Sequence, residues 1–591
     1  MTPVSVWAPR AETVKLDCNG RLFDMKKDES GWWTLDEPFI EHGTDYAFHV
    51  DGDGPFPDPR SPWQAHDVHG PSRRLDHQRF VWSDEGWQQV PLSSAVIYEL
   101  HVGTFTPQGD FDSVCDHLDH LVELGVTHVE LMPVAQFSGN RGWGYDGVSL
   151  YAPHNAYGGP EGLKRLVNAC HQRKLAVLLD VVYNHLGPEG NYLSRFGPYF
   201  TNRHTTPWGE AVNLDGPDSD EVRRFFIDNA LMWLRDYHFD GLRIDAVHAI
   251  VDTSAIHFLE QLAAEVKELQ AEMGRHLALI AESDLNDPRV IRAPQIGGYG
   301  IDAQWNEDFH HALHALLTGE RDGYFEDFGK LSDLAKVLSR GLVYDGCYSA
   351  YRHRCHGRPA TGLCGHQFVG CLQNHDQVGN RAIGERTSHL LSPELLKIGA
   401  AIVMTSPFVP MLFQGEEWAS SSRFLYFTDH QDPNLGEAVR QGRRNEFGAF
   451  GWNPEQIPDP QAEETFLRSK LDWGEPARSM HGELLGWYRS LIKLRRRLSC
   501  LSNGRLSEIE VDFDETKRWL TMKRGSVVVL CNFAETAQRI PCARPDQNKI
   551  LLASKEGIVA ANGTFSMPGH AVTILQSNID SKAPPHCRQE V

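Results

Sequence analysis

The sequence has no closely spaced cysteine pair, no excess of positive charge and no long hydrophobic run. Its 11 cysteines are scattered without a CxxC motif, which argues against a disulfide framework or a zinc site and favours reduced thiols. The formal net charge of -22 makes nucleic acids and anionic membrane surfaces poor partners, because both require a basic surface. The longest apolar runs stop well short of the ~20 residues that a membrane-spanning helix needs. The start of the chain also lacks the pattern of a secretory signal, so we expect a cytoplasmic protein.

What the sequence does contain is enough chain for several domains. A single hydrophobic core stops growing well below 591 residues. Hydrophobic residues make up 41% of the chain and charged residues 23%, which is ordinary for a globular protein and argues against extensive disorder.

Changes in the pattern of hydrophobic residues along the chain predict where the domains lie. Residues 1–90 carry short alternating runs between Gly, Pro and Asp clusters, which predicts an amino-terminal β-sandwich. Residues 91–482 alternate between strand-like and helix-like segments. Residues 483–577 begin with a helical pattern and continue as β-rich sequence, which predicts a second sandwich, and residues 578–591 are expected to form a loose tail.

The middle section predicts a (β/α)₈ barrel. Its strand-like runs alternate with amphipathic helical segments at 111–122 and 256–269, among others, and this alternation implies parallel strands joined by right-handed crossovers. An open doubly wound sheet is the rival, but a barrel gathers polar residues from separate strand ends on one rim. The eight predicted strands end near Val102, Val134, Val182, Ala246, Ala281, Trp305, His375 and Gln414.

Carboxylates follow four of these apolar runs, at Asp180, Asp245, Glu282 and Asp376. Carboxylates are costly to bury, so their position after buried strands suggests that they converge on one pocket. A pair of carboxyl groups can cleave an acetal when one donates a proton and the other attacks the sugar carbon. Asp245 and Glu282 are the best candidates for this pair.

The neighbours of the two candidates suit these roles. Arg243 stands two residues before Asp245 on the same strand, so it would point to the same side and favour the ionised form of Asp245. Glu282 follows the apolar residues Leu279, Ile280 and Ala281, and an apolar setting would raise its pKa toward that of a general acid.

Four motifs resemble, in order, the signature regions of the α-amylase superfamily of glycoside hydrolases. They are Asp180-Val-Val-Tyr-Asn-His185, Gly241-Leu-Arg-Ile-Asp-Ala246, Ala281-Glu-Ser-Asp284 and Gln373-Asn-His-Asp-Gln377. The resemblance implies that Asp245 is the nucleophile, Glu282 the acid/base and Asp376 the third carboxylate, which grips sugar hydroxyls. It also implies that Asp180 supports Arg243. Further sugar contacts implied at the subsite beside the cleaved bond are His185, His375 and Tyr145.

Further segments are similar to one family within this superfamily, the maltooligosyltrehalose trehalohydrolases. The segments are Asp180–Tyr192, His204–Gly209, Asp302–His311 and Leu372–Arg381. This resemblance implies hydrolysis, with retention, of the α-1,4 bond next to a terminal trehalose unit. It also implies functional pairing with a maltooligosyltrehalose synthase. Trp305 and the charged pair Glu307-Asp308 are candidates to line the trehalose side, although a strand-ending aromatic is as often packing.

We expect no cofactor and no required metal. His310-His311 and the histidines at 353 and 356 are not accompanied by a cluster at zinc spacing, so hydrogen-bonded histidines are the simpler interpretation. Asn184 resembles a calcium ligand of amylases, but His248-Ala249 replaces the usual Lys-His after the nucleophile strand.

Three other functions compete with this one. A glucan branching enzyme shares the leading sandwich and barrel but usually carries two adjacent acidic residues in the third motif and Ser-His-Asp in the fourth. A debranching isoamylase matches less well at Asp302–His311. A non-catalytic glucan-binding scaffold typically loses a catalytic carboxylate, whereas all three are present here.

Overall fold

The computed structural model describes residues 4–35, 40–448, 453–542 and 545–577. The chain divides into two compact units. The first comprises Met1–Trp305, Gln373–Arg386 and Met411–Arg478, and the second comprises Asn306–Leu372, Thr387–Pro410 and Ser479–Val591. The division into domains at 1–90, 91–482 and 483–577 stays a prediction. The predicted loose tail at 578–591 lies outside the described residues.

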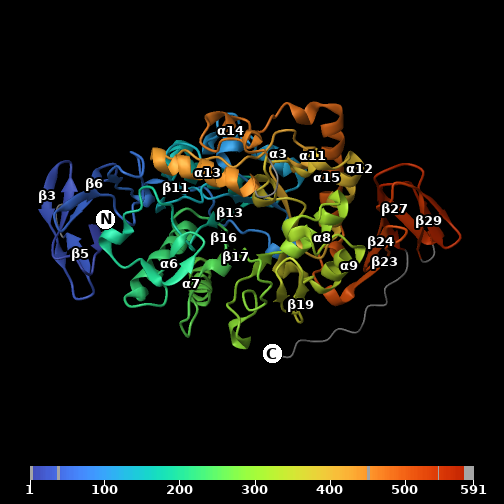
Figure 1. Ribbon diagram of the computed structural model, residues 1–591, viewed down its shortest axis with the longest axis horizontal. Helices are drawn as coiled ribbons and strands as arrows, with labels where there is room; N and C mark the ends of the chain where they lie inside the picture. Colours follow the sequence, from blue (N-terminus) through green and yellow to red (C-terminus); the bar gives the residue numbers. More distant parts are fainter. Residues whose placement is uncertain (1–3, 36–39, 449–452, 543–544, 578–591) are drawn as a thin grey trace. The chain divides into compact units, whose positions relative to one another are not determined.

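Eight parallel strands close into a barrel, which confirms the predicted fold class (Figure 1). Each strand ends close to the position predicted from its apolar run. The hydrogen-bonded order around the barrel is β10-β13-β16-β17-β18-β21-β22-β9. The strands are β9 (Ile97–Leu100), β10 (His128–Leu131), β13 (Ala176–Val181), β16 (Gly241–Ile244), β17 (Ala278–Ala281), β18 (Ala303–Trp305), β21 (Phe368–Cys371) and β22 (Val409–Phe413).

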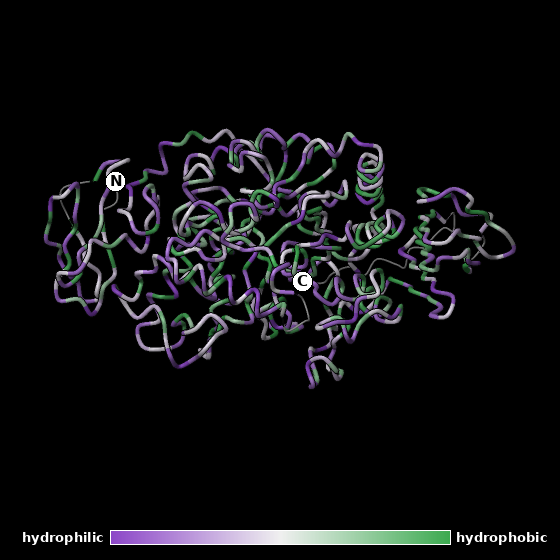
Figure 2. The backbone as a smooth tube through the Cα atoms, turned by 45° about the horizontal axis from the view of Figure 1, so that its top comes forward, coloured by the Kyte–Doolittle hydropathy of each residue, from purple (hydrophilic) through white to green (hydrophobic). Residues whose placement is uncertain are grey.

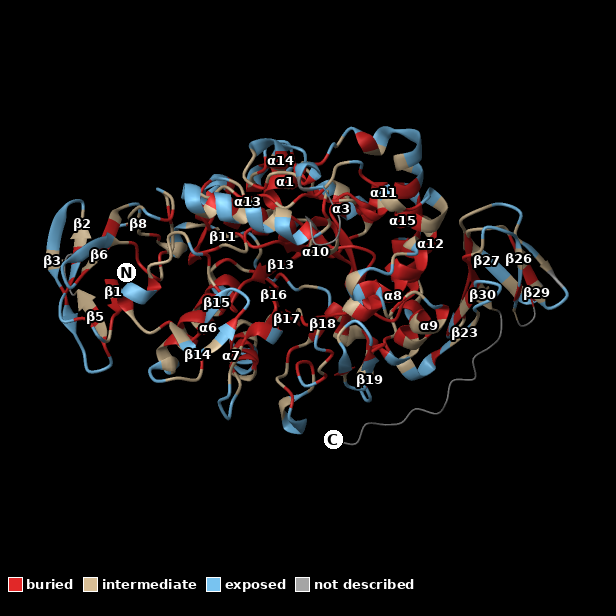
Figure 3. Cartoon of the chain, viewed as in Figure 1, coloured by how far each residue is buried: buried red, intermediate tan, exposed pale blue. Residues whose placement is uncertain are grey.

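The barrel strands are buried along their whole length, as Figure 3 shows for β13, β16 and β17. β13 reads Ala-Val-Leu-Leu-Asp-Val, and every one of these residues is buried. Strands covered on both faces need near-continuous apolar sequence, which explains why apolar runs rather than alternation marked them. The register pairs Asp180 on β13 with Arg243 on β16, so these two side chains stand at the same level.

Two predicted helices differ in detail from the structure. The helical face at 111–122 is divided between α2 (Phe111–Cys115) and α3 (Leu118–Leu124). The next begins later than predicted, because His257 caps α7 (Phe258–Met273) by accepting a hydrogen bond from the backbone of Leu259. Ile256 therefore lies before the helix and is 58% exposed.

Other helices flank the barrel strands along the chain. The larger ones include α4 (Gly159–Gln172), α6 (Ser219–Asp236), α8 (Glu307–Thr318), α9 (Leu331–Arg340), α12 (Pro393–Thr405), α13 (Pro433–Gly448) and α15 (Ser479–Arg497). Figure 2 shows hydrophobic and hydrophilic stretches alternating along the chain. Within the described ranges, no helix combines the length and apolar character needed to cross a membrane.

Antiparallel sheets precede and follow the barrel in the sequence. The leading part forms one sheet from β1 (Val4–Trp7), β5 (Trp32–Leu35) and β4 (Lys26–Lys27), and another from β3 (Arg21–Asp24), β2 (Val14–Cys18), β6 (Asp45–Val50), β7 (Asp53–Phe56) and β8 (Ser72–Arg73). The trailing part pairs β23 (Ile509–Asp514), β24 (Trp519–Arg524), β25 (Val527–Asn532), β30 (Ala571–Ser577) and β27 (Asn548–Ala553). A smaller trailing sheet contains β26 (Gln538–Pro541), β29 (Thr564–Met567) and β28 (Val559–Ala561).

A buried cluster of charged side chains connects residues 84–87, which precede β9, to residues near the amino-terminal ends of the barrel strands. The carboxylate of Asp240 accepts hydrogen bonds from Trp87 Nε1 at 2.8 Å and Arg275 Nη2 at 2.8 Å, and its Oδ2 lies 2.9 Å from His171 Nε2. The other ring nitrogen of His171 lies 2.8 Å from Asp84 Oδ2. Burial opposes a charge on His171, but the hydrogen bonds to Asp240 and Asp84 outweigh it and raise the pKa of His171. Burial works against ionised Asp240, and the bond to His171 outweighs it and lowers the pKa of Asp240.

Replacing Asp240 with asparagine is expected to destabilise the protein by about 3 to 5 kcal/mol, because it leaves buried cations uncompensated. Urea unfolding measures this loss, with the exposed Asp112→Asn as a control that costs under about 1 kcal/mol. The stabilisation from His171 is fully present below its unfolded pKa and is lost as pH rises through its raised value. The stabilisation from Asp240 is present above its unfolded pKa and is lost as pH falls. A loss no larger than that of the control would show that the cluster does not stabilise the fold.

Candidate active site

Three of the predicted carboxylates gather around one fully buried guanidinium, that of Arg243. Its Nη1 donates to Asp180 Oδ2 at 2.6 Å and to Asp245 Oδ1 at 2.9 Å. Its Nη2 lies 2.9 Å from Glu282 Oε2. Burial opposes the charge on Arg243, and Asp180 together with Glu282 raises its pKa well above the usual value. The structure thus brings carboxylates from β13, β16 and β17 to one point, as the sequence predicts.

Both oxygens of Asp245 accept hydrogen bonds. Oδ1 accepts from Arg243, and Oδ2 accepts from the side-chain amide of Asn184 at 2.7 Å. The same amide also donates to the backbone oxygen of Asp245 at 2.8 Å. Donors on both oxygens fix the direction of the carboxylate, which a nucleophile requires.

Glu282 is in a different environment. Its Oε2 accepts a 2.7 Å hydrogen bond from the backbone N–H of Ala246, which adopts the left-handed conformation with φ of 38°. Such backbone is uncommon for a residue with a Cβ, and here it directs the N–H at the carboxylate. Burial raises the pKa of Glu282 against the attraction of Arg243, and the charge of Asp245 adds to the rise. A raised pKa suits Glu282 to the role of proton donor.

Asp376 is the most accessible of the predicted catalytic groups. It stands in α10 (His375–Gly379), its side chain is 32% exposed, and its Oδ1 accepts from Asn380 at 3.1 Å. The Nε2 of the preceding His375 lies 3.5 Å from Asp376 Oδ1. An exposed carboxylate beside the buried cluster is available to accept hydrogen bonds from sugar hydroxyls.

The predicted sugar contacts His375 and Tyr145 lie together. Their rings stack with centroids 5.2 Å apart, and Tyr145 Oη lies 2.7 Å from His375 Nε2. Tyr145 also donates to Asp180 Oδ2 at 2.7 Å, which ties the pair to the Arg243 cluster. Burial raises the pKa of Asp180 to about 7, and the charge of Arg243 opposes the rise.

His185 faces an exposed tryptophan on a hairpin. The ring of Trp208 is 50% exposed and stacks on that of His185, with centroids 4.4 Å apart and an interplanar angle of 5°. Trp208 lies in the turn between β14 (Phe200–Thr206) and β15 (Gly209–Val212). His185 Nδ1 hydrogen bonds to Asn184, and burial lowers the pKa of His185 to about 4. The site therefore has a neutral histidine flanked by an accessible aromatic face.

Two predicted substrate contacts are buried and used elsewhere. Trp305 is 2% exposed and packs its ring 4.1 Å from the guanidinium carbon of Arg243, where it supports the cation. Asp308 is 3% exposed, and its Oδ2 accepts from the backbone N–H groups of Val343 and Tyr344. Both side chains make these contacts within the protein, and their roles as substrate contacts stay a prediction. Arg243, which the sequence places beside Asp245 on the same strand, contacts the carboxylates.

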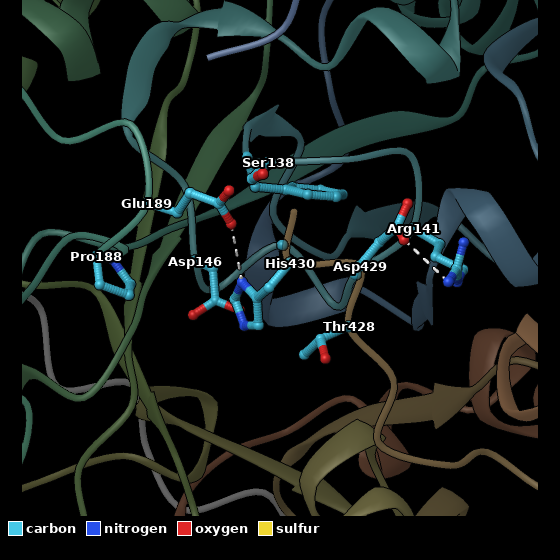
Figure 4. Close-up of a pocket in the computed structure, with 11 residues that line it drawn as sticks. Ser138, Arg141, Asp146, Pro188, Glu189, Thr428, Asp429 and His430 are labelled. Carbon is cyan, nitrogen blue, oxygen red and sulfur yellow. Dashed lines mark ion pairs between the residues drawn. The ribbon is translucent and has the colours of Figure 1, made fainter. Parts of the chain in front are cut away.

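A pocket adjoins Tyr145 through its neighbour Asp146 (Figure 4). His430 stands in it between two carboxylates, with Nδ1 3.6 Å from Glu189 and Nε2 3.9 Å from Asp146. Burial raises the pKa of Asp146, and the charge of His430 opposes that rise. An ion pair of 2.9 Å between Arg141 and Asp429 borders the same pocket.

One group of side chains among the described residues has metal-ligand spacing. The ligand atoms of Glu307, His310 and His311 lie within 4.8 Å of one another. The Nε2 of His311 is 3.7 Å from the Glu307 carboxylate, an ordinary contact between neighbours one helical turn apart. Asn184, which resembles a calcium ligand in sequence, directs its amide at Asp245.

Several residues of the site were not predicted from the sequence. Asn184 holds Asp245, and Trp208 covers His185. Glu99 on β9 lies 2.5 Å from His375 Nδ1 and is 1% exposed. The available signal for Glu99 is a charged residue inside the apolar run Val96-Ile-Tyr-Glu-Leu100, a position that is costly unless the charge is paired.

The arrangement can cleave an acetal by double displacement. Asp245 and Glu282 are the pair of carboxyl groups that this reaction would use, one to attack and one to donate to a leaving oxygen. The polar surroundings of Asp376 and Tyr145 suit a sugar ring rather than an apolar ligand.

Comparisons with known proteins match the first part of the barrel to a family model and nearly the full chain to curated relatives. Residues 75–204 match a family model described as "Alpha amylase, catalytic domain", and residues 504–574 match a model described as "Domain of unknown function". The chain is 50% identical to the malto-oligosyltrehalose trehalohydrolase of Arthrobacter ramosus over 578 residues, which cover 97% of this chain and 99% of that protein.

One solved structure resembles the chain over nearly its full length, and a more distant enzyme resembles only part of it. A crystal structure from Salmonella typhimurium, whose description places it among the alpha amylases, has a TM-score of 0.90 and 38% identity. The match covers 97% of each chain. The 1,4-alpha-glucan branching enzyme of Vibrio parahaemolyticus is 32% identical over 349 residues, which cover 52% of this chain and 46% of that enzyme.

Proposed function

The chain belongs to the malto-oligosyltrehalose trehalohydrolase family of α-amylase-type glycoside hydrolases, and on this premise we propose how its site acts. The protein hydrolyses the α-1,4-glucosidic bond next to the terminal trehalose of a maltooligosyltrehalose, and it releases trehalose and a maltooligosaccharide. The observation that supports this mechanism is that the guanidinium of Arg243 contacts the carboxylates of both Asp245 and Glu282. Their unequal surroundings divide the roles of nucleophile and acid.

The reaction proceeds in two displacements. Asp245 attacks the anomeric carbon of the last glucose of the chain while Glu282 donates its proton to the oxygen of the departing trehalose. The product of this step is a covalent glycosyl ester on Asp245. Glu282, now ionised, then takes a proton from water, which attacks the same carbon and frees the sugar chain. Two inversions at one carbon give net retention.

Other side chains bind the reacting sugar. Asp376 accepts hydrogen bonds from its hydroxyls, and its exposure allows this contact. His185, His375 and Tyr145 line the same subsite, as the resemblance implies. Asp180 holds Arg243 in place and does not react.

Neither rival enzyme nor scaffold is supported by a separate observation. The likeness to the branching enzyme covers about half of the chain. A non-catalytic scaffold typically lacks one of the three catalytic carboxylates, but Asp245, Glu282 and Asp376 are all present. Two of them, Asp245 and Glu282, contact Arg243. We further propose that the protein acts in the cytoplasm, together with a maltooligosyltrehalose synthase that supplies its substrate.

The experiment that tests this proposal offers maltotriosyltrehalose and maltopentaose in parallel and identifies the released sugars. Free trehalose and maltotriose from the first substrate, with little attack on the second, support the proposal. Equal cleavage of maltopentaose would make the protein a general amylase. New α-1,6 branches on a longer glucan would make it a branching enzyme.

Trp208 is expected to contribute to substrate selection. Removing its exposed ring by Trp208→Ala should lower kcat/KM on maltotriosyltrehalose by about 10- to 100-fold, equivalent to ~1–3 kcal/mol. Steady-state kinetics on both substrates measure the change. The matched control is Trp82→Ala, which removes a tryptophan stacked on His238, 3.8 Å between centroids, near the opposite ends of the strands. Equal kinetics for the two variants would exclude a substrate contact at Trp208.

A further inference from the structure

Glu99 lies beneath the sugar-binding histidine and has no role in the two displacements. It is 1% exposed, on the first barrel strand. Both of its carboxylate oxygens meet His375: Oε2 accepts from the backbone N–H at 3.0 Å, and Oε1 lies 2.5 Å from ring Nδ1. A carboxylate that holds both the backbone and the ring of one histidine fixes its orientation.

The hydrogen bonds on the other side of the ring define its protonation. Tyr145 has a single phenolic proton, and it donates that proton to Asp180 Oδ2 at 2.7 Å. Its oxygen must therefore accept at the 2.7 Å contact with His375 Nε2, so Nε2 carries a proton. Nδ1 carries one as well, because Glu99 there acts as an acceptor. Two N–H groups make His375 an imidazolium.

The charged groups around His375 favour its protonated form more than burial opposes it. Burial opposes it, but the charges of Asp376 and Glu99 raise the pKa of His375 to about 10. Arg243 opposes that rise. Other titratable groups facing this cluster are Tyr145, Asp180, Glu282, Glu130 and His101.

We propose that Glu99 is a positioning residue that keeps His375 doubly protonated and thereby orients Tyr145 toward Asp180 and the sugar-binding site. The inference rests on the proposed function, because His375 and Tyr145 act there on the substrate. Without the carboxylate, His375 becomes neutral in the working pH range and loses one donor. The oxygen of Tyr145 then no longer accepts a hydrogen bond from His375 Nε2, so the rings of Tyr145 and His375 are no longer held in place in the sugar-binding subsite.

A neighbouring glutamate provides an internal contrast. Glu130 on β10 pairs in register with Glu99, so the two stand at one level of the barrel, and Glu130 is also 1% exposed. Neither of its carboxylate oxygens has a hydrogen-bond partner among the described residues. Burial raises its pKa well above the usual value, and the charge of Glu99 adds to the rise. Glu130 thus lacks a hydrogen-bonding partner among the described residues, whereas Glu99 contacts His375 through both oxygens.

The test compares Glu99→Gln with Glu130→Gln, two isosteric changes at one level of the barrel. We measure kcat, KM and the pH profile on maltotriosyltrehalose, and thermal midpoints verify folding. Glu99→Gln should lower kcat by about 10- to 100-fold with a smaller change in KM. In this variant His375 loses its counter-charge, so it should lose its proton at lower pH than Glu282 and move the alkaline limb, which Glu282 sets in the wild-type protein, to lower pH by about one unit or more. Glu130→Gln changes a carboxyl group that makes no hydrogen bond among the described residues, and it should leave both parameters and the profile unchanged.

A third variant separates charge from packing. Glu99→Asp keeps the charge on a shorter arm, so it should retain the wild-type alkaline limb even where kcat is reduced. A Glu99→Gln profile that matches wild type would overturn the inference, as would equal losses in the two glutamine variants. If Glu99→Gln does not fold, Glu99→Asp decides alone: a reduced kcat with a retained limb supports the inference, and a wild-type kcat or a displaced limb overturns it. Failure of the wild-type protein to release trehalose would contradict the proposed function instead, so the two failures are distinguishable.

Discussion

Asp245→Asn is expected to lower kcat on maltotriosyltrehalose by about 10⁴-fold or more, because the amide cannot form the glycosyl ester. The substitution keeps the size of the side chain but directs an amide toward the Asn184 donor or toward Arg243. We therefore expect a modest loss of stability and an almost complete loss of turnover. Steady-state kinetics and thermal unfolding measure the two effects separately.

The surface variant Asp112→Asn is a suitable control, because Asp112 pairs with the exposed Arg165. It should retain full activity. Residual turnover of Asp245→Asn at a tenth of the wild-type rate would place the nucleophile on another residue. A substantial loss of folded protein, by contrast, would show only that Asp245 is needed for stability.

Glu282→Gln is expected to lower kcat by about 10³- to 10⁴-fold, because the amide cannot donate a proton to the departing trehalose or activate water. The loss should be much smaller for the first displacement on a maltosyl fluoride, whose leaving group needs little protonation. Pre-steady-state release of fluoride measures that step directly. Equal losses on both substrates would argue against a role as general acid.

The pH dependence of the wild-type protein tests the same residue. Glu282 acts as an acid only in its protonated form, and its pKa is raised by burial and by the charge of Asp245. Activity should therefore persist above the usual pKa of a glutamate and decline as pH rises through the raised value. Glu282→Gln should remove this alkaline limb from the profile. An unchanged limb in the variant would assign it to another group.

The sequence was sufficient to predict the barrel because its strands are buried on both faces. Such strands must be apolar throughout, and their ends are marked by polar motifs, as at β13 and β16. Helix boundaries were less predictable. Ile256 fits the helical period of 256–269, but the cap at His257 starts the helix after it. Periodicity identifies a helical face, whereas capping geometry decides where the helix begins.

The candidate site was predictable where a residue lies at a strand end and less so where burial decides its role. Asp245 and Glu282 follow their strands directly, and their surroundings were expected from adjacent residues. Trp305 also ends a strand, yet its side chain points onto Arg243, a direction that sequence spacing does not reveal. Glu99 was missed because its partner His375 is distant in sequence and meets it only when the barrel closes.

The most direct test of the account is to trap the covalent intermediate. Glu282→Gln incubated with α-maltotriosyl fluoride should form the glycosyl ester but hydrolyse it slowly, because the base that activates water is absent. Mass spectrometry of the intact protein and of its peptic peptides then locates the added sugar. The account predicts one maltotriosyl group on the peptide that contains Asp245. An adduct on a peptide containing Asp180 or Asp376, or release of fluoride with inversion and no adduct, would contradict it.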